Sequence, residues 1–270
     1  MDVQGKSILV IGLGRSGQAA AALLAGRGAR VTCVDETESE DLMKARGRLK
    51  KDGIEVLLGC KKAPAAKRFD LAVLSPGVDP TRPLVMEVTA SGVPMIGELE
   101  AGFLFCRCPL VALTGTNGKT TTTELIDAIF RMNGKRTMAV GNIGVPLTEA
   151  CLKSEEMDML VVEVSSFQLE TIRTFRPRVS LMMNITPDHF DRYPDLTTYA
   201  RAKARLWENQ TAEDWAVVNR DSEKLLAGLG VRPQARVSRY AFCGSDDVDF
   251  WCEGPRVFEK GRGQVFDLAE

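Results

Sequence analysis

The chain has 270 residues, with 35 Lys and Arg against 36 Asp and Glu, which gives a net charge of −1 and a pI of about 6.1. This near balance excludes the strongly basic character of a dedicated nucleic-acid or anionic-membrane binder. The 44% apolar and 26% charged composition is that of a globular protein, and the length allows roughly two domains of about 100–200 residues each.

Neither targeting segments nor cysteines suggest an extracellular protein. The longest apolar run, 19–25, is far shorter than the roughly 20 residues of a membrane-spanning helix, and no basic and then apolar leader opens the chain. We therefore expect a cytoplasmic protein with no membrane partner. Seven cysteines without regular spacing predict reduced, mostly buried thiols. Cys106 and Cys108 are close together, but with a single histidine in the chain they do not make a four-ligand zinc site.

The first ninety or so residues alternate strand and helix signals, a pattern typical of a parallel α/β domain. Residues 92–105 look like a passage out of this domain, and we place its end near residue 94. A Rossmann-like domain over 1–93 is therefore predicted. Its expected strands are 8–11, 30–34, 54–57 and 71–74, and its expected helices run up to Gly26, over 42–51 and after Pro83.

A second α/β unit, of the P-loop ATPase type, is expected over 94–270. Its final part differs from the rest, because 247–251 and 256–268 alternate like antiparallel strands around a hairpin turn at 259–263. The chain stops there, so we expect this domain to be truncated. The preceding strands are expected at 110–113, 137–140, 159–164, 179–184 and 215–219, with helices from about 119 to 133 and from 196 to 208.

A glycine-rich motif, Gly12-x-Gly14-x-x-Gly17, lies between a predicted strand and a predicted helix, and Asp35 ends the next strand. Glycines in such a turn let the backbone approach a pyrophosphate at the helix N-terminus, and the carboxylate can accept ribose hydroxyls. A turn needed only for packing is the alternative, but strand, helix and acidic residue together favour a nucleotide ligand. The motif does not separate a dinucleotide from a UDP-sugar.

The stronger signal is the loop Gly115-Thr-Asn-Gly118-Lys119-Thr120 between a predicted strand and a predicted helix. Backbone N–H groups, an ammonium and a hydroxyl in this order bind nucleotide phosphates and their magnesium ion. The loop departs from the strict G-x-x-x-x-G-K-[ST] spacing, because position 113 is Leu and the leading glycine is Gly115. An ATP site is a better explanation than a chance glycine turn before a helix.

Three further residues stand in positions that suggest chemistry. Glu163 is the one carboxylate of an apolar strand, where a lone buried charge is costly, so we expect it to ligate magnesium at the strand's carboxyl end, although a surface-edge position is possible. His189, the only histidine, lies in a loop between aspartates, where a plain surface histidine is the alternative, and its position after another strand's carboxyl end favours function. Lys203 shares the apolar face of its helix, either with its stem packed on the core or as a partly desolvated, reactive amine.

These residues, together with Gly141-Asn-Ile-Gly144, Glu163-Val-Ser-Ser-Phe-Gln-Leu-Glu170 and Asp188-His-Phe-Asp-Arg-Tyr193, closely resemble the Mur ligase family. The second and third segments look like those of its D-glutamate-adding branch. The likeness runs from about residue 5 to the end of the chain. It implies a UDP-binding domain, a central ATPase domain and a C-terminal domain that this chain lacks.

The resemblance implies that the first glycine motif holds a UDP-sugar and that the second loop holds ATP with two magnesium ions. Lys119, Glu163, His189 and Lys203 would be catalytic. The metal ions would be bound by Thr120, Glu163, His189 and Lys203, the last as a carbamate formed with CO2. The implied ATP-binding residues are Gly115, Thr116, Asn117, Gly118, Lys119, Thr120 and Thr121. The implied substrate-binding residues are Gly14, Arg15, Ser16, Asp35, Glu36, Ser75, Gly77, Asn142, Ser165 and Gln168.

The implied activity belongs to the synthesis of peptidoglycan precursors. ATP would phosphorylate the alanyl carboxylate of UDP-N-acetylmuramoyl-L-alanine, and the amine of D-glutamate would displace the phosphate, in a monomeric enzyme. One alternative is an NAD-dependent oxidoreductase built on Gly12 to Gly17 and Asp35, which leaves the 115–120 loop unexplained. Another is a truncated nucleotide-binding fragment without turnover, in which UDP-sugar binding survives and ligation is weak or absent.

Overall fold

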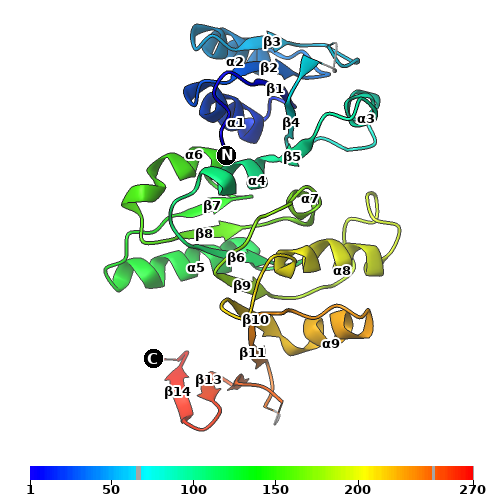
Figure 1. The fold of residues 1–270 in the computed structure, drawn as a ribbon. Coiled ribbons are helices and arrows are strands. Elements are labelled where there is room, and N and C mark those ends of the chain that lie inside the picture. Colours follow the sequence, from blue (N-terminus) through cyan, green and yellow to red (C-terminus); the bar gives the residue numbers. More distant parts are fainter. Residues whose placement is uncertain (65–67, 245–246, 270) are drawn as a thin grey trace. The chain divides into compact units, whose positions relative to one another are not determined.

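The computed structural model describes residues 1–64, 68–244 and 247–269. They form two compact units, each built around one sheet (Figure 1). The first unit contains Met1–Cys108 with two later segments, Val140–Met157 and Phe167–Phe175. The second contains Pro109–Ala139, Asp158–Ser166 and the chain from Arg176 onward. Among these residues, no helix combines the length and the apolar character needed to span a membrane.

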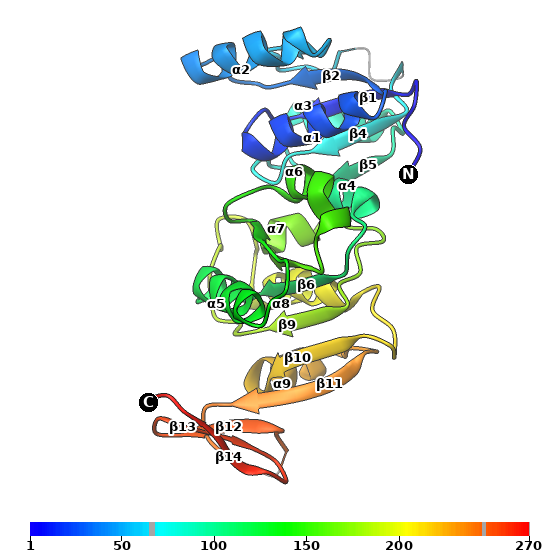
Figure 2. The same ribbon diagram turned by 90° about the vertical axis from the view of Figure 1, so that its left-hand side faces the viewer.

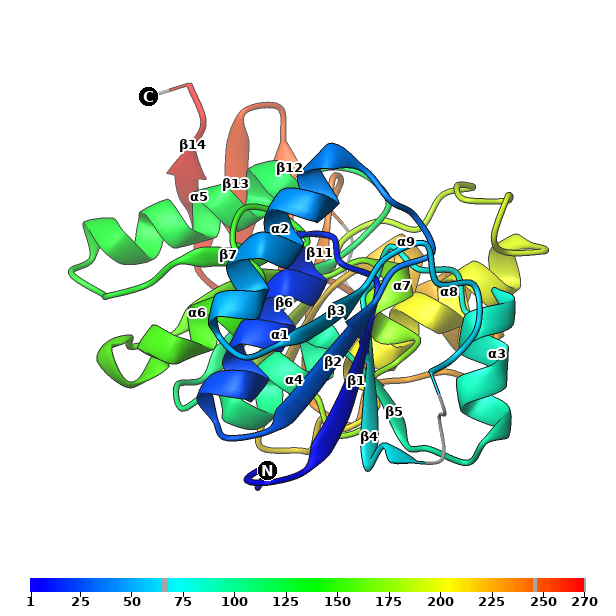
Figure 3. The same ribbon diagram turned by 90° about the horizontal axis from the view of Figure 1, so that it is seen from above.

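The first unit has a five-stranded sheet in the order β3-β2-β1-β4-β5, in which each strand pairs with its neighbours in parallel. The α/β prediction is therefore confirmed. Helices α1 and α2 cover one face of the sheet and α3 covers the other (Figure 3). The elements are β1 (Ser7–Ile11), α1 (Arg15–Gly26), β2 (Arg30–Val34), α2 (Glu40–Lys51), β3 (Glu55–Leu57), β4 (Leu71–Leu74), α3 (Pro83–Ala90), β5 (Met95–Gly97) and α4 (Glu98–Phe105).

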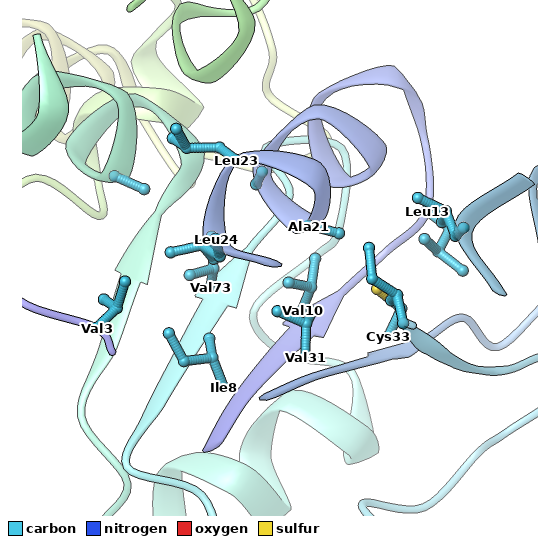
Figure 4. Close-up of a cluster of buried hydrophobic side chains, with 14 of the residues drawn as sticks. Val3, Ile8, Val10, Leu13, Ala21, Leu23, Leu24, Val31, Cys33 and Val73 are labelled. Carbon is cyan, nitrogen blue, oxygen red and sulfur yellow. The ribbon is translucent and has the colours of Figure 1, made fainter. Parts of the chain in front are cut away.

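Alternation along β1 explains why both faces of this sheet are apolar. Ile8 and Val10 point to the side of α1, where they join a cluster with Leu24 (Figure 4). Leu9 and Ile11 point to the other side and pack in the cluster that contains residues of α3. These four side chains are at most 1% exposed. A strand covered on both faces reads as a continuous apolar run, which is the signal found at 8–11.

The first turn of α4 carries two buried glutamates with different surroundings. Glu100 accepts hydrogen bonds on both oxygens, from the backbone N–H groups of Arg173, Thr174 and Phe175 and from the Thr174 hydroxyl. Glu98 accepts only from Thr148, through the backbone at 2.8 Å and the hydroxyl at 2.7 Å, both on Oε1. Its Oε2 has no hydrogen-bond partner among the described residues. Burial therefore raises the pKa of Glu98 above its ordinary value of 4.5.

Because the pKa of Glu98 is higher in the folded chain than in the unfolded one, its ionisation weakens the fold as the pH rises through that interval. Glu98→Gln keeps an oxygen for Thr148 and carries no charge. We expect this variant to gain stability relative to the wild type as the pH rises above 4.5, by about 1–3 kcal/mol. Thermal unfolding across this pH range measures it. Glu100→Gln is the matched control and should destabilise the chain; an equal loss in both variants would contradict the assignment.

The second unit has a nine-stranded sheet in the order β14-β13-β12-β11-β10-β9-β6-β8-β7. Pairings from β8 through β12 are parallel, and those of β12 with β13 and of β13 with β14 are antiparallel, which confirms the expected β-rich C-terminal stretch (Figure 2). The strands are β6 (Leu110–Thr114), β7 (Ala139–Gly141), β8 (Leu160–Glu163), β9 (Val179–Met182), β10 (Trp215–Asn219), β11 (Arg236–Ala241), β12 (Phe250–Glu253), β13 (Arg256–Glu259) and β14 (Gly263–Asp267).

Helix α5 covers one face of this sheet, and α8 and α9 cover the other (Figures 1 and 3). The structure adds α9 and β11, which the sequence reading had left unassigned. The expected helix over 196–208 is α8 followed by the short helix η3. The helical segments after β6 are α5 (Lys119–Met132), α6 (Leu147–Ala150), η2 (Cys151–Glu156), α7 (Ser166–Leu169), α8 (Leu196–Ala204), η3 (Arg205–Trp207) and α9 (Arg220–Gly228).

The cysteines differ from the expectation. All seven are free thiols, but Cys33 and Cys151 alone among them are buried, so the prediction of mostly buried thiols is wrong. The reason is their placement, because several of the others lie in connections between elements, where side chains are partly open to solvent.

Candidate functional site

A pocket of about 310 Å³ opens in the first unit at the carboxyl ends of β1, β2 and β4. This edge of a parallel sheet is the usual place for a ligand. The pocket brings together five of the expected substrate-binding residues, Gly14, Asp35, Glu36, Ser75 and Gly77. The other lining residues are Ile11, Gly12, Val34, Thr37, Val78, Asp79, Arg82 and Leu84.

Asp35 fixes the glycine loop to the end of β2. One carboxylate oxygen accepts the backbone N–H of Leu13 at 2.8 Å. The other accepts the backbone N–H and the hydroxyl of Thr37, at 2.9 and 2.7 Å. The carboxylate therefore shapes the pocket wall as well as lining it, a role that the motif did not reveal.

Two glycines of the motif are required by the packing of the loop. Gly12 has φ +88°, and a Cβ there would lie 2.4 Å from Cγ2 of Val78. At Gly17 a Cβ would lie 1.8 Å from the backbone oxygen of Gly12. Around Gly14, in contrast, nothing among the described residues lies within 4 Å of the added atom. Gly12 and Gly14 both line the pocket, and of these two only Gly14 leaves room for a Cβ.

Arg82 and Glu36 form an ion pair at the pocket, with 3.4 Å between Nη1 and Oε2. The sequence analysis did not single out Arg82, which immediately precedes Pro83 at the start of α3. Arg15 does not line this pocket and instead borders a separate hollow that includes Gln18 and Glu149. Ser16 is also absent from the pocket lining.

In the second unit, the loop after β6 leads into α5, and Gly118 adopts φ +80° directly before the helix. Asn184, which follows β9, holds this loop from the neighbouring strand. Its side-chain oxygen accepts the backbone N–H of Asn117 at 2.8 Å, and its amide donates to the backbone oxygen of Asn117 at 2.9 Å. The backbone oxygen of Asn184 accepts the N–H of Thr116 at 2.8 Å. The sequence analysis missed Asn184.

Lys119 and Thr120, the first residues of α5, present an ammonium and a hydroxyl at the loop. The Lys119 ammonium donates to the backbone oxygen of Thr116 at 2.9 Å. The Thr120 hydroxyl donates to Oε2 of Glu163 at 2.8 Å. Glu163 is the last residue of β8, which pairs with β6, and it is only 1% exposed. The geometry therefore places a buried carboxylate beside the residues expected to meet the ATP phosphates.

Lys203 is buried, at 1% exposure, and its ammonium donates to the backbone oxygen of Gly115 at 2.8 Å. The ammonium also lies 4.5 Å from the ring centre of Tyr199. Burial, reinforced by the charge of Lys119, lowers the pKa of Lys203 to about 7. The helix-face prediction is confirmed, because Tyr199 and Lys203 are both buried on α8. A sizeable fraction of this amine is unprotonated at neutral pH.

His189 lies in the loop after β9 with φ +54°, an unusual conformation for a residue other than glycine. Its ring is 6.0 Å from that of Tyr199 in an edge-to-face arrangement. Its Nε2 lies 3.7 Å from Oδ2 of Asp188. The structure therefore brings His189 and Lys203 to the same tyrosine.

The three remaining substrate-binding candidates are divided between the units. Asn142, exposed, and Gln168, 2% exposed, belong to the first unit. Ser165, partly buried, belongs to the second. Their shared role in substrate binding stays a prediction.

The donors around Glu163 suit magnesium. Within the described parts of the chain, no group of three or more Cys, His, Asp or Glu residues could hold a metal ion. Mg²⁺ does not need one, since it is commonly bound through one or two carboxylates, substrate phosphates and water. A buried carboxylate hydrogen-bonded to the Thr120 hydroxyl supplies the hard oxygen donors that this ion prefers.

Family models match both parts of the chain. The Mur ligase middle domain matches residues 113–269, and the MurD-like N-terminal domain of Mur ligases matches residues 6–97. Two curated relatives carry the name UDP-N-acetylmuramoylalanine--D-glutamate ligase. The one from Pelobacter propionicus is 45% identical over 276 residues, which cover 100% of this chain and 60% of the relative. The one from Trichlorobacter lovleyi is 46% identical over 223 residues, which cover 83% and 50%.

Solved structures agree in fold. The UDP-N-acetylmuramate:L-alanyl-gamma-D-glutamyl-meso-diaminopimelate ligase from Neisseria meningitides superposes with a TM-score of 0.60 at 19% identity, covering 97% of this chain and 87% of that one. UDP-N-acetylmuramate-alanine ligase from Thermotoga maritima gives a TM-score of 0.53 at 20% identity, covering 96% and 59%. None of these names supports the oxidoreductase alternative.

The chain spans about half the length of the curated relatives it matches. The middle-domain model alone covers more than half of the chain. This protein therefore belongs to the Mur ligase family.

Proposed function

We propose that this chain provides the UDP-sugar-binding and ATP-binding parts of an ATP-dependent ligase that joins D-glutamate to UDP-N-acetylmuramoyl-L-alanine. Residues 1–93 would bind the UDP-sugar and 94–270 would bind ATP, in a monomer working in the cytoplasm. The observation that carries the proposal is the buried Glu163 held by Thr120 at the end of the glycine-rich loop. The D-glutamate specificity rests on relatives 40–46% identical that are named for it.

The proposed reaction is a phosphoryl transfer followed by an acyl transfer. The alanyl carboxylate attacks the γ-phosphorus of ATP, and ADP leaves. The amine of D-glutamate then attacks the acyl phosphate, phosphate leaves, and an amide forms. In this scheme the backbone N–H groups of the 115–118 loop and the Lys119 ammonium orient and neutralise the phosphates. Two Mg²⁺ ions, one held by Thr120 and Glu163 and one by His189 and the carbamate of Lys203, would supply further charge stabilisation when bound.

The substrate assignment is tested by calorimetric titration with UDP-N-acetylmuramoyl-L-alanine, UDP and NAD, and by an assay for phosphate and amide product with ATP and D-glutamate. We expect binding of the UDP-sugar and of UDP, no binding of NAD, and dependence on D-glutamate of any phosphate that is released. Tight NAD binding without a response to the UDP-sugar would sink the proposal. Substituting L-glutamate for D-glutamate is the matched control for the incoming amino acid.

Lys203 offers a separate test, because its neutral amine can add CO2 to form a carbamate and release one proton. With ¹³C-labelled bicarbonate near pH 8, where an amine of pKa about 7 is mostly neutral, we expect a carbamate carbon signal from the wild type. Lys203→Met should abolish the signal, whereas substitution of the exposed Lys224 to Met should leave it intact. A signal that persists in Lys203→Met would remove Lys203 from the carbamate assignment.

A further inference from the structure

The connection between α4 and β6 contains two thiols that the proposed function does not use. Cys106 and Cys108 are both partly exposed, and their sulfur atoms lie 3.8 Å apart. Cys106 Sγ is also within 3.5 Å of the backbone oxygen of Cys108. The side chains of two residues separated by a single position therefore turn toward each other.

The backbone around the pair is held in place. The N–H of Arg107, between the two cysteines, donates to the hydroxyl of Ser154 at 3.0 Å. Ser154 is 1% exposed, and its hydroxyl donates to the backbone oxygen of Cys151 at 2.6 Å. The N–H of Cys106 donates to the backbone oxygen of Phe103 at 3.1 Å. The thiols are consequently presented on an anchored segment.

The geometry permits a bond between the two sulfur atoms. Two residues of extended chain place Cα atoms at most about 7 Å apart, close to the upper end of the 4.4–6.8 Å range found in disulfides. Side-chain rotation with a small backbone adjustment is enough to close the bond. A disulfide formed under such constraint is also readily reduced, as regulatory disulfides are.

We propose that Cys106 and Cys108 form a reversible redox site, in which Cys106 reacts with a peroxide and Cys108 resolves the product to an intrachain disulfide. In the first step the Cys106 thiolate attacks one peroxide oxygen, the O–O bond breaks, and a sulfenic acid and hydroxide form. In the second step the Cys108 thiol attacks that sulfur, an S–S bond forms, and the oxygen leaves as water with the Cys108 proton. The peroxide is reduced by two electrons and the dithiol is oxidised by two.

The assignment of the two roles has an electrostatic basis. The hydrogen bond from the Cys108 thiol is the main cause that lowers the pKa of Cys106 to about 6, and the same interaction raises the pKa of Cys108. Accessible thiolates beside a resolving thiol are the usual sites of reversible oxidation. Cys151, whose thiol is buried and whose pKa is raised by that burial, is the less reactive neighbour.

The sequence supplies a direct readout, because trypsin cleaves after Arg107, between the two cysteines. Reduced protein should give separate peptides 69–107 and 108–119. After brief treatment of the 270-residue chain with hydrogen peroxide, we expect these peptides to remain joined until a reductant is added. Peptides that separate after oxidation, or linkage of Cys106 to Cys151 instead, would overturn the proposal. This measurement tests the proposal on the wild-type chain, without any variant.

Variants then assign the two roles. With dimedone present, Cys108→Ser should accumulate a trapped sulfenic acid at Cys106, whereas Cys106→Ser should give little at Cys108. Cys108→Ala, which lacks a donor to Cys106, should react several-fold more slowly than Cys108→Ser. Equal trapping in Cys106→Ser and Cys108→Ser would contradict the assignment. Cys243→Ser, which removes an exposed thiol elsewhere, is the matched control and should form the Cys106–Cys108 disulfide as the wild type does.

Discussion

Gly17→Ala is expected to destabilise the first unit by about 3 kcal/mol or more, the upper end for an overpacked site. The added Cβ would lie 1.8 Å from the backbone oxygen of Gly12 and 2.9 Å from its carbonyl carbon. Backbone atoms cannot rotate away as a side chain can, so α1 must move away from the loop after β1. Because that movement separates Leu24 of α1 from Val10 of β1 in the same cluster, the loss extends into the core. Chemical denaturation followed by far-UV circular dichroism measures it.

Gly14→Ala is the matched control from the same motif. No described atom lies within 4 Å of a Cβ at Gly14, and its φ of −59° is ordinary for alanine. We expect its unfolding free energy to change by less than about 1 kcal/mol. Since Gly14 lines the pocket, the affinity of the Gly14→Ala variant for the UDP-sugar should nevertheless fall. Equal destabilisation by both substitutions would show that general loop rigidity, and not the approach of α1 to Gly12, explains the motif.

The strands and helices differ in how far the sequence alone predicts them. Strands β1 and β4 of the first unit were predictable because both of their faces are covered, so that each one reads as an apolar run ended by a glycine or a polar residue. Strand β5, only three residues long, was not predicted. Strand β11 gave no such signal, since four of its six residues are only partly buried. Helix α9 depends on Asn219, whose side chain accepts from the backbone N–H groups of Asp221 and Ser222. An asparagine at the end of a strand is equally typical of a turn, so the sequence alone does not predict this helix.

The residues of the candidate sites also differ in how far the sequence alone predicts them. Lys203 could be recognised because its position on the apolar face of a helix conflicts with its charge. Asn184 could not, because its role arises when β9 pairs with β6 and brings it beside Asn117. The second function of Asp35, as the acceptor for Leu13, likewise depends on a loop geometry that the motif does not encode. A local sequence pattern reveals which kind of side chain stands at a position. Contacts between the ends of neighbouring strands can be predicted only when the register of the sheet is known.

Because of that register, substitutions of Glu163 and Thr120 are the strongest test of the ATP site. Residues Leu113 and Glu163 are opposite each other in the β6–β8 pair, so the carboxylate lies at the level where the loop begins. Glu163→Gln keeps an oxygen for the Thr120 hydroxyl but removes the negative charge that a magnesium ion requires. We expect the affinity for ATP in the presence of Mg²⁺ to fall at least tenfold, about 1.4 kcal/mol, and to approach that of the wild type in EDTA. Calorimetric titration with and without Mg²⁺ measures it.

The controls separate loss of the metal from loss of the fold. Removing a buried charge should leave thermal stability unchanged or raised, because the carboxylate no longer needs to be desolvated. Glu124→Gln removes the same charge from an exposed position on α5 and should bind Mg²⁺ and ATP normally. Thr120→Ser keeps the hydroxyl and should resemble the wild type, whereas Thr120→Val should resemble Glu163→Gln. If Glu163→Gln retains full Mg²⁺ dependence, the buried carboxylate is a structural partner of Thr120 and the ion is held elsewhere.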